Sequence, residues 1–149
     1  MTGHPQRQFR ARMSGLDEAL AFAEAFVTAN GIAPGDALRL CLIIEELFTN
    51  TVEHGHGGGS DSLVGLALAA DDTCVWLDYE DAAAEFDPVQ WLAATAGGAD
   101  APPDEAQVGG LGLRLVARLA ASMAYTREDG RNRLRLVLVR RVPGRCPKE

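Results

Sequence analysis

The stretch Ile43-Ile44-Glu45-Glu46-Leu47-Phe48-Thr49-Asn50-Thr51-Val52-Glu53-His54 reads as the second half of a long amphipathic helix. At about 100° per residue, Asn50 falls one turn after Glu46 on the same face, Glu53 joins them, and Arg39 lies two turns earlier. The other half of the helix carries Ala37, Leu40, Cys41, Ile44, Leu47, Phe48 and Thr51. A carboxylate and a carboxamide one turn apart can share one bound group. We therefore interpret Glu46 and Asn50 as a polar notch on an otherwise apolar helix.

The whole chain, residues 1–149, has the length and composition of one globular domain, with 47% hydrophobic and 23% charged residues. A net charge of -7 argues against direct binding of nucleic acid, which needs a basic surface. The apolar runs are shorter than the roughly 18 residues of a membrane span, and Met1 to Arg12 has no apolar signal core. Three widely spaced cysteines without a C-x-x-C motif are typical of free thiols. We expect a cytoplasmic protein that neither enters a membrane nor binds nucleic acid.

Two long helices are predicted in the first third of the chain. Ser14-Gly15-Leu16-Asp17 has the form of a capping box and should begin a helix, which Asn30-Gly31 should end. We interpret Asp36 as the N-cap of the second helix, because its oxygens can accept from free amides and its charge suits the helix dipole. That second helix should continue to His54 and stop at Gly55.

Strands are predicted around two turns. Asp71-Asp72-Thr73 joins two apolar runs, and Asp129-Gly130 between alternating runs is a strong hairpin signal. The predicted strands are 6–13, 63–70, 74–79, 123–127 and 132–140. Because the strands cluster in hairpins, we expect an α+β fold with a mixed or mostly antiparallel sheet and helices packed on one face.

The segment between the two hairpins carries a second candidate site. Pro88 to Ala94 fits a short helix, and Thr95 to Val108 has no periodicity, which favours a functional lid. Gly109-Gly110-Leu111-Gly112 then leads into an amphipathic helix through Leu119. Free amides and the positive end of the helix dipole outline a phosphate site there, although glycines before a helix are often structural.

Three separated features therefore need a common explanation: the Glu46 and Asn50 pair, Asp81 at the end of a strand, and the glycines before the later helix. Each feature also has a structural interpretation that involves no ligand. The Glu46 and Asn50 pair could be a solvated helix face, and Asp81 could be a turn residue. Their occurrence together, in this order and spacing, favours a single site.

With these motifs the chain resembles the GHKL ATP-binding superfamily, and within it the stand-alone anti-sigma-factor serine/threonine kinases, which are histidine-kinase-like ATPase domains. The resemblance covers nearly the whole chain and implies the Bergerat-type ATP-binding fold, a two-layer α/β sandwich. Its most specific pieces are Glu45-Glu46-Leu-Phe-Thr-Asn50-Thr-Val-Glu-His54-Gly55, Phe86-Asp87-Pro88 after Asp81, Gly109-Gly110-Leu-Gly112-Leu113 and Asn132-Arg133-Leu134.

The resemblance implies a role for each matching residue. Asn50 would coordinate the Mg²⁺ bound to the ATP phosphates, which suits the preference of Mg²⁺ for hard oxygen ligands. Glu46 would act as general base, and Asp81 would hydrogen-bond the adenine amino group. Gly110 and Gly112 would wrap the phosphates. The residues implied to bind ATP are Asn50, Asp81, Ala83, Gly109, Gly110, Leu111, Gly112 and Leu113.

One box departs from the family pattern Asp-x-Gly-x-Gly-Phe-Asp-Pro. Ala83 and Glu85 stand where glycines are expected. Glycine permits a positive φ and a close backbone approach, so alanine and glutamate should add bulk and strain. Glu85 would also bring negative charge towards an anionic nucleotide. These two replacements could weaken, alter or abolish nucleotide binding.

The resemblance implies an ATP-dependent protein serine kinase that acts as an anti-sigma factor and phosphorylates an anti-anti-sigma partner of the STAS type. It also implies a homodimer that contacts the sigma factor. A second hypothesis is a regulatory module that keeps the fold but works by protein contact alone, which the altered glycine box favours and the retained Glu46 disfavours. A third, the catalytic fragment of a sensor histidine kinase, is disfavoured because the sequence shows no phosphoacceptor helix or membrane segment.

Overall fold

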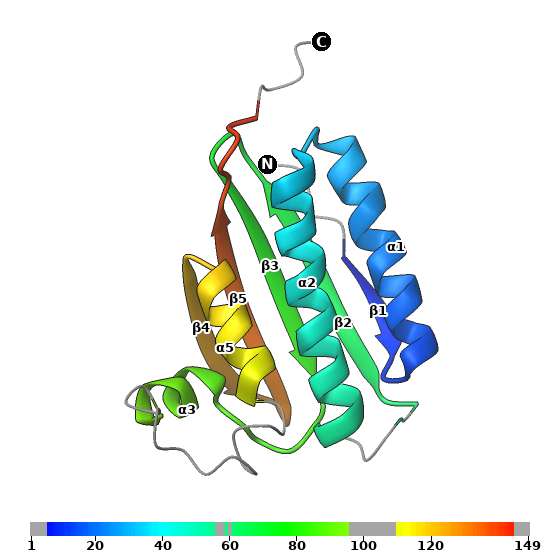
Figure 1. Ribbon diagram of the computed structural model, residues 1–149. Helices are drawn as coiled ribbons and strands as arrows, with labels where there is room; N and C mark the ends of the chain where they lie inside the picture. The colour runs from blue at the N-terminus through cyan, green and yellow to red at the C-terminus, as the bar shows by residue number, and fades with distance from the viewer. Residues whose placement is uncertain (1–5, 56–58, 60, 96–109, 145–149) are drawn as a thin grey trace.

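The chain folds into two layers, a five-stranded sheet with helices packed on one face (Figure 1). The computed structural model describes residues 6–55, 59, 61–95 and 110–144. The strand order is β1-β2-β3-β5-β4, and every neighbouring pair is antiparallel. The predicted α+β class and two-layer architecture are confirmed, and the antiparallel alternative for the sheet holds.

The elements follow the predicted order along the chain. The strands are β1 Gln6–Arg10, β2 Leu63–Ala70, β3 Cys74–Asp81, β4 Ser122–Glu128 and β5 Arg131–Val139. The helices are α1 Met13–Ala29, α2 Pro34–Asn50, α3 Pro88–Ala94 and α5 Gly110–Leu119, and α2 runs on into a π-helical turn, Thr51–Gly55. None of the described helices is long and apolar enough to cross a bilayer.

The core lies between the sheet and α1, α2 and α5. Strand β3 alternates strictly, so that Val75, Leu77 and Tyr79 are buried under the helices while the residues between them face the other side. The matching positions of β5 are Leu134, Leu136 and Leu138. This period-two pattern fixes the register, since a slip by one residue would turn the apolar set outward.

Both predicted turns form as expected. In the first, the Asp71 carboxylate accepts hydrogen bonds from the amides of Thr73 and Cys74, at 2.8 Å each. In the second, Asp129 and Gly130 both adopt positive φ, 53° and 74°, which is the conformation that two-residue hairpins prefer.

The capping box predicted at the start of the first helix does not form, although the helix begins within one residue of Ser14. Helix α1 begins at Met13, its N-cap Arg12 makes no capping hydrogen bond, and Ser14 lies inside the first turn. The cause is a tight connection: β1 ends at Arg10, three residues earlier than predicted, and Gly15 passes against the Arg10 carbonyl so closely that a Cβ there would overlap its oxygen. Close backbone packing, rather than a side-chain cap, sets this helix start.

The predicted N-cap of the second helix is also wrong. Ala33 is the N-cap of α2, and Asp36 is buried in the first turn. Its carboxylate accepts from Arg39 at 2.6 Å and from the amides of Arg141 and Val142 at 3.0 and 3.2 Å. Burial alone would raise the pKa of Asp36, but these bonds hold it below its usual value. Asp36 thus ties the start of α2 to the chain that follows β5.

Candidate functional site

Glu46 and Gly112 meet where α2 packs against α5. A Cβ placed on Gly112 would lie 2.5 Å from Glu46 Oε2 and 3.3 Å from its carboxyl carbon. The carboxylate of the half-buried Glu46 therefore rests directly on the first turn of α5, near the positive end of that helix dipole. Only glycine allows so close an approach. The two predicted features, the polar notch and the glycine turn, thus form one site.

Asn50 lies one turn beyond Glu46, in the last turn of α2, and is half-buried. No described residue hydrogen-bonds its side-chain amide, so the amide oxygen is open to a ligand. The helix changes from α to π geometry directly after it. Single π-helical turns within helices are frequent at functional sites.

Arg39 does not line the notch, although its spacing predicted that it would. Its guanidinium is buried and donates to the carbonyl oxygens of Leu119 at 3.2 Å and Val139 at 2.6 Å, besides Asp36. It joins the C-terminal ends of α5 and β5 to α2. Arg39 is therefore a structural cation that fixes the angle at which α5 presents Gly112 to Glu46.

Asp81 ends β3 with a buried carboxylate that three neighbours hold in place. Thr51 Oγ1 lies 2.8 Å from Oδ2, while Asn132 Nδ2 and the Ala83 amide donate to Oδ1 at 2.9 and 3.2 Å. Thr51 Oγ1 is in turn 2.5 Å from the Tyr79 hydroxyl, which also lies 3.1 Å from the Leu47 carbonyl oxygen. A carboxylate offers about four acceptor positions, so roughly one remains for a ligand that donates an N–H.

Tyr79 is fully buried, and this burial raises its pKa well above the usual value. Its hydroxyl therefore stays protonated and keeps donating. Together with Thr51 it connects the end of α2 to Asp81, so that hydrogen bonds link the notch to the end of the strand.

Asn132 is a site residue that the sequence reasoning did not assign, although it belongs to one of the matching motifs. Its Nδ2 faces Asp81 Oδ1 and the carbonyl oxygens of Ala83 and Ala84, at 2.9, 3.2 and 3.0 Å. Its Oδ1 accepts from Tyr125 OH at 2.6 Å, Arg127 Nη1 at 3.1 Å and the Phe86 amide at 3.3 Å. The available signal was its place in the motif Asn132-Arg133-Leu134, whereas the register that pairs Asn132 with Asp81 is seen only in the structure.

The loop after Asp81 does not carry the expected backbone strain. Asp129 has the single positive φ among the described non-glycine residues, so Ala83 and Glu85 adopt ordinary conformations. Ala83 is buried, whereas Glu85 is exposed. Partial burial raises the pKa of Tyr125 on β4, and the negative charge of Glu85 raises it further.

The rest of the Phe86-Asp87-Pro88 motif has a local explanation. Asp87 is the N-cap of α3, and its carboxylate accepts from the amides of Val89 and Gln90 at 2.9 and 3.1 Å. Pro88 occupies the first helical position, where its missing N–H costs nothing.

The remaining predicted residues are only partly brought to this site. Gly110 begins α5, Leu111 is 65% exposed, and Leu113 is buried in the core. Leu113 can therefore offer a ligand its backbone but not its side chain. Gly109 and all of the predicted lid except Thr95 lie outside the described residues.

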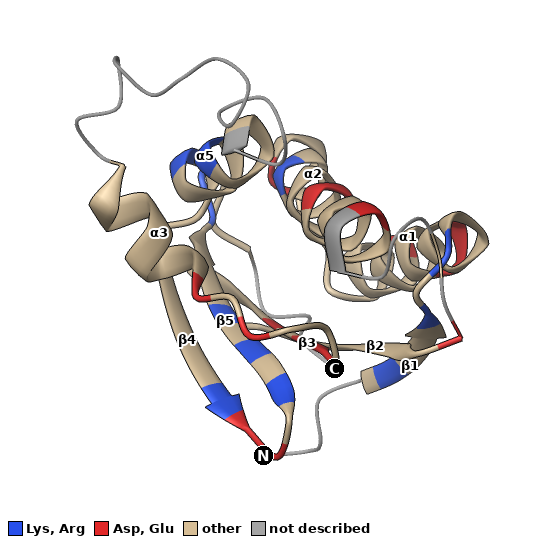
Figure 2. Cartoon of the chain, turned by 90° about the horizontal axis from the view of Figure 1, so that it is seen from below, with Lys and Arg blue, Asp and Glu red and all other residues tan. Residues whose placement is uncertain are grey.

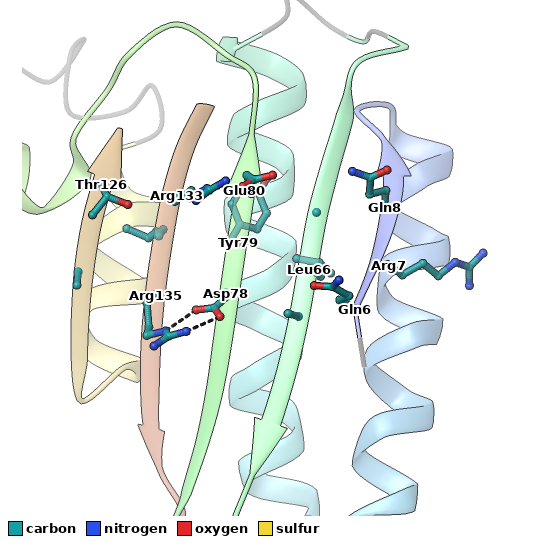
Figure 3. A pocket seen from close by; sticks show the side chains of 14 residues that line it. Gln6, Arg7, Gln8, Leu66, Asp78, Tyr79, Glu80, Thr126, Arg133 and Arg135 are labelled. Atoms are coloured by element: carbon teal, nitrogen blue, oxygen red, sulfur yellow. Dashed lines mark hydrogen bonds and ion pairs between the residues drawn. The ribbon is translucent and has the colours of Figure 1, made fainter. Parts of the chain in front are cut away.

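A hollow of about 940 Å³ lies on the other face of the sheet, away from Glu46 and the helices (Figure 3). Side chains of the strands line it, and Arg135 is paired there with Asp78 at 2.6 Å. Glu80 pairs with Arg131 and Arg133 beside it. This hollow is separate from the notch, so it does not belong to the candidate ATP site.

Comparisons with known proteins bear on this site. Residues 9–138 match the protein family described as "Histidine kinase-like ATPase domain". The serine/threonine-protein kinase BtrW of Bordetella bronchiseptica is 34% identical over 102 residues, which span 65% of this chain and 66% of BtrW, just under two thirds of its length.

Two solved structures share the fold. A chain from the SiaB–SiaC complex of Pseudomonas aeruginosa gives a TM-score of 0.59 at 17% identity, over 91% of this chain and 89% of that chain. A structure of the RsbU and RsbW domains of a Mycobacterium tuberculosis protein gives a TM-score of 0.61 at 17% identity, over 93% of this chain and 34% of that chain.

Proposed function

The chain belongs to the histidine kinase-like ATPase domain family, and from this premise we propose that it is an ATP-dependent protein serine kinase. The similarity to BtrW, which is named a serine/threonine-protein kinase, supports kinase-type activity. We further propose that it acts in the cytoplasm as an anti-sigma factor, whose substrate is a serine of a STAS-type anti-anti-sigma protein. That narrower role rests on the motifs shared with the anti-sigma-factor kinases.

The observation that carries the kinase proposal is the contact between Glu46 and Gly112. It brings a carboxylate that can accept a proton to the helix turn that can bind phosphate.

The residues present fit Mg²⁺ and ATP. Asn50 offers one amide oxygen that no residue of the described ranges binds, and Mg²⁺ usually takes few protein ligands while phosphates and waters complete its shell. Asp81 keeps about one acceptor position for the adenine amino group. Gly112 has no side chain of its own, so the first turn of α5 comes close to the Glu46 carboxylate.

The chain's own residues would then do the following work. Glu46 would accept the proton of the partner's serine hydroxyl at its carboxylate, Asn50 would hold the metal, and the amides at the start of α5 would bind phosphate oxygens. When bound, the Mg²⁺ and ATP supply the transferable phosphoryl group and the charge neutralisation that its transfer needs. Phosphorylation would add negative charge to the partner's surface and so change which complex it forms.

The alternative function, a binding module without catalysis, is favoured by Ala83 and Glu85 in place of glycines. Against it stands the loop itself, which accommodates both residues without a positive φ.

Nucleotide affinity with and without Mg²⁺ tests the proposal. We expect Mg²⁺ to increase the ATP affinity of the wild type. The ATP affinity of Asn50→Ala should not increase with Mg²⁺, because the Asn50 amide oxygen is the proposed protein ligand to the metal. Asn30→Ala is the matched control, since Asn30 bonds only Phe26 at the end of α1. Failure of ATP to bind the wild type at millimolar concentration would contradict the proposal.

We also propose that the protein is a homodimer joined through the uncovered face of the sheet. No described helix covers this face, and basic residues run along β5 there (Figure 2). Opposite charges pair on this face, Asp78 with Arg135 and Glu80 with Arg133. Each guanidinium has further N–H donors, which could bind acidic side chains of a second copy. The small residues Gly65 and Ala67 in the hollow would let another sheet approach.

This proposal predicts a change of mass in solution. Ala67→Arg places a long charged side chain in the hollow and should convert a dimer to a monomer in analytical ultracentrifugation. Ala25→Arg, the same exchange on the exposed side of α1, should leave the dimer intact. A wild-type monomer, or a dimer that survives Ala67→Arg, would contradict the sheet-face interface.

A further inference from the structure

Asn132 lies at the centre of six hydrogen-bond partners where β5, β4 and the loop after β3 meet. Three acceptors surround its Nδ2: Asp81 Oδ1, Ala83 O and Ala84 O. Three donors surround its Oδ1: Tyr125 OH, Arg127 Nη1 and the Phe86 amide. A flipped amide would set every one of these contacts against a like group, so the partners fix its orientation.

The six contacts divide into three kinds. One holds the carboxylate of Asp81, three hold the loop 82–86 through two of its carbonyl oxygens and one amide, and two orient the Asn132 amide from Tyr125 and Arg127. Arg127 adds a second bond to the Ala83 carbonyl, at 2.9 Å. The loop is therefore fixed by side chains from the β4–β5 hairpin, at the positions where the family pattern has flexible glycines.

The same geometry controls what Asp81 can bind. Its Oδ1 is occupied by Asn132 and the Ala83 amide and its Oδ2 by Thr51, which leaves about one acceptor position in a fixed direction. A carboxylate held in this way accepts an N–H and disfavours a base that presents no donor, because its remaining lone pair would stay unpaired.

We propose that Asn132 is a positioning residue that sets base selectivity: it holds Asp81 and the loop 82–86 in place so that Asp81 accepts from an exocyclic amino group. The proposal rests on the proposed ATP-binding function and deepens it. Asn132 also holds the loop at Ala83, which is one of the two positions where the family pattern has glycine.

The test compares ATP with purine riboside triphosphate, which lacks the 6-amino group, in direct binding measurements. Wild-type protein should prefer ATP by about tenfold or more, the typical worth of one hydrogen bond to a charged group. Asn132→Ala should lose most of this preference while binding the analogue as the wild type does. Tyr125→Phe removes one donor that orients the amide and should lower the preference in the same direction by less.

Thermal unfolding of each variant separates positioning from folding. A purely structural role would weaken both nucleotides in proportion or lower stability, and leave their ratio unchanged. An unchanged ratio in folded Asn132→Ala, or in Tyr125→Phe if the first variant is unfolded, would overturn the proposal. Failure of the wild type to bind ATP at all would instead overturn the proposed function beneath it.

Discussion

Glu46→Gln is expected to lower phosphate transfer to a serine substrate by about 10²- to 10⁴-fold, the usual contribution of a general base. The amide keeps the shape of the side chain and its contact with Gly112 but cannot accept the proton. ATP affinity should stay within about threefold of the wild type, because Glu46 is assigned to the proton and not to the nucleotide.

Glu45→Gln is the matched control, because the Glu45 carboxylate is exposed on the same helix and the substitution removes the same charge. It should transfer phosphate at the wild-type rate. Transfer at the wild-type rate by Glu46→Gln would remove Glu46 from the mechanism. An equal loss of transfer in Glu46→Gln and Glu45→Gln would point to a general charge effect.

Gly112→Ala is expected to lower transfer by about 10²-fold without unfolding the protein. The new Cβ would lie 2.5 Å from Glu46 Oε2, so the carboxylate must swing away, and a misplacement of about 1 Å can cost that much. The displaced group is the tip of a flexible side chain, and alanine favours helix by about 0.5–1 kcal/mol over glycine, so stability should hold or rise slightly.

Gly15→Ala provides the contrast, because the same exchange there meets backbone. Its Cβ would overlap the Arg10 carbonyl oxygen and also approach Phe48 at 3.2 Å, and neither the strand end nor the core can easily give way. We expect a loss of about 1–3 kcal/mol in the free energy of unfolding, measured by denaturant titration. If Gly112→Ala were the destabilised variant and remained fully active per folded molecule, the contact with Glu46 would have no catalytic meaning.

Much of the fold follows from local signals. The apolar stripe through Ile44 and Phe48 predicted α2, and Asp129-Gly130 predicted the last hairpin, because helix periodicity and turn conformation are properties of a few neighbouring residues. The family motifs also identified Glu46, Asn50 and Asp81 as candidates, and the structure places Glu46 against the predicted glycine turn.

The errors share one cause, which is contact between distant parts of the chain. Arg39 has a polar side chain at the spacing of the notch, but its partners Leu119 and Val139 lie 80 and 100 residues away. The helix-cap predictions at Ser14 and Asp36 failed because packing against Arg10 and the chain after β5 took precedence. Asn132 went unassigned for the same reason, since Asp81 is 51 residues away.

The replaced glycines illustrate how a correct motif can carry a wrong consequence. Ala83 and Glu85 do depart from the family pattern, but the strain expected from them assumed a glycine-like backbone. The chain takes an ordinary conformation there and is held by the Asn132 side chain instead. Contacts made by a residue from another strand cannot be seen in the local sequence.

The central claim is that ATP held between α2 and α5 gives up its γ-phosphate to a serine. It is tested most directly by incubating the full chain with γ-labelled ATP, Mg²⁺ and a STAS-type protein from the same organism, and locating the label by mass spectrometry. We predict one phosphoserine on the STAS-type protein, formed by the wild type and Glu45→Gln and absent with Glu46→Gln. ATP binding that depends on Mg²⁺ but leaves every STAS-type protein of the organism unlabelled would contradict the kinase function and favour regulation by contact alone.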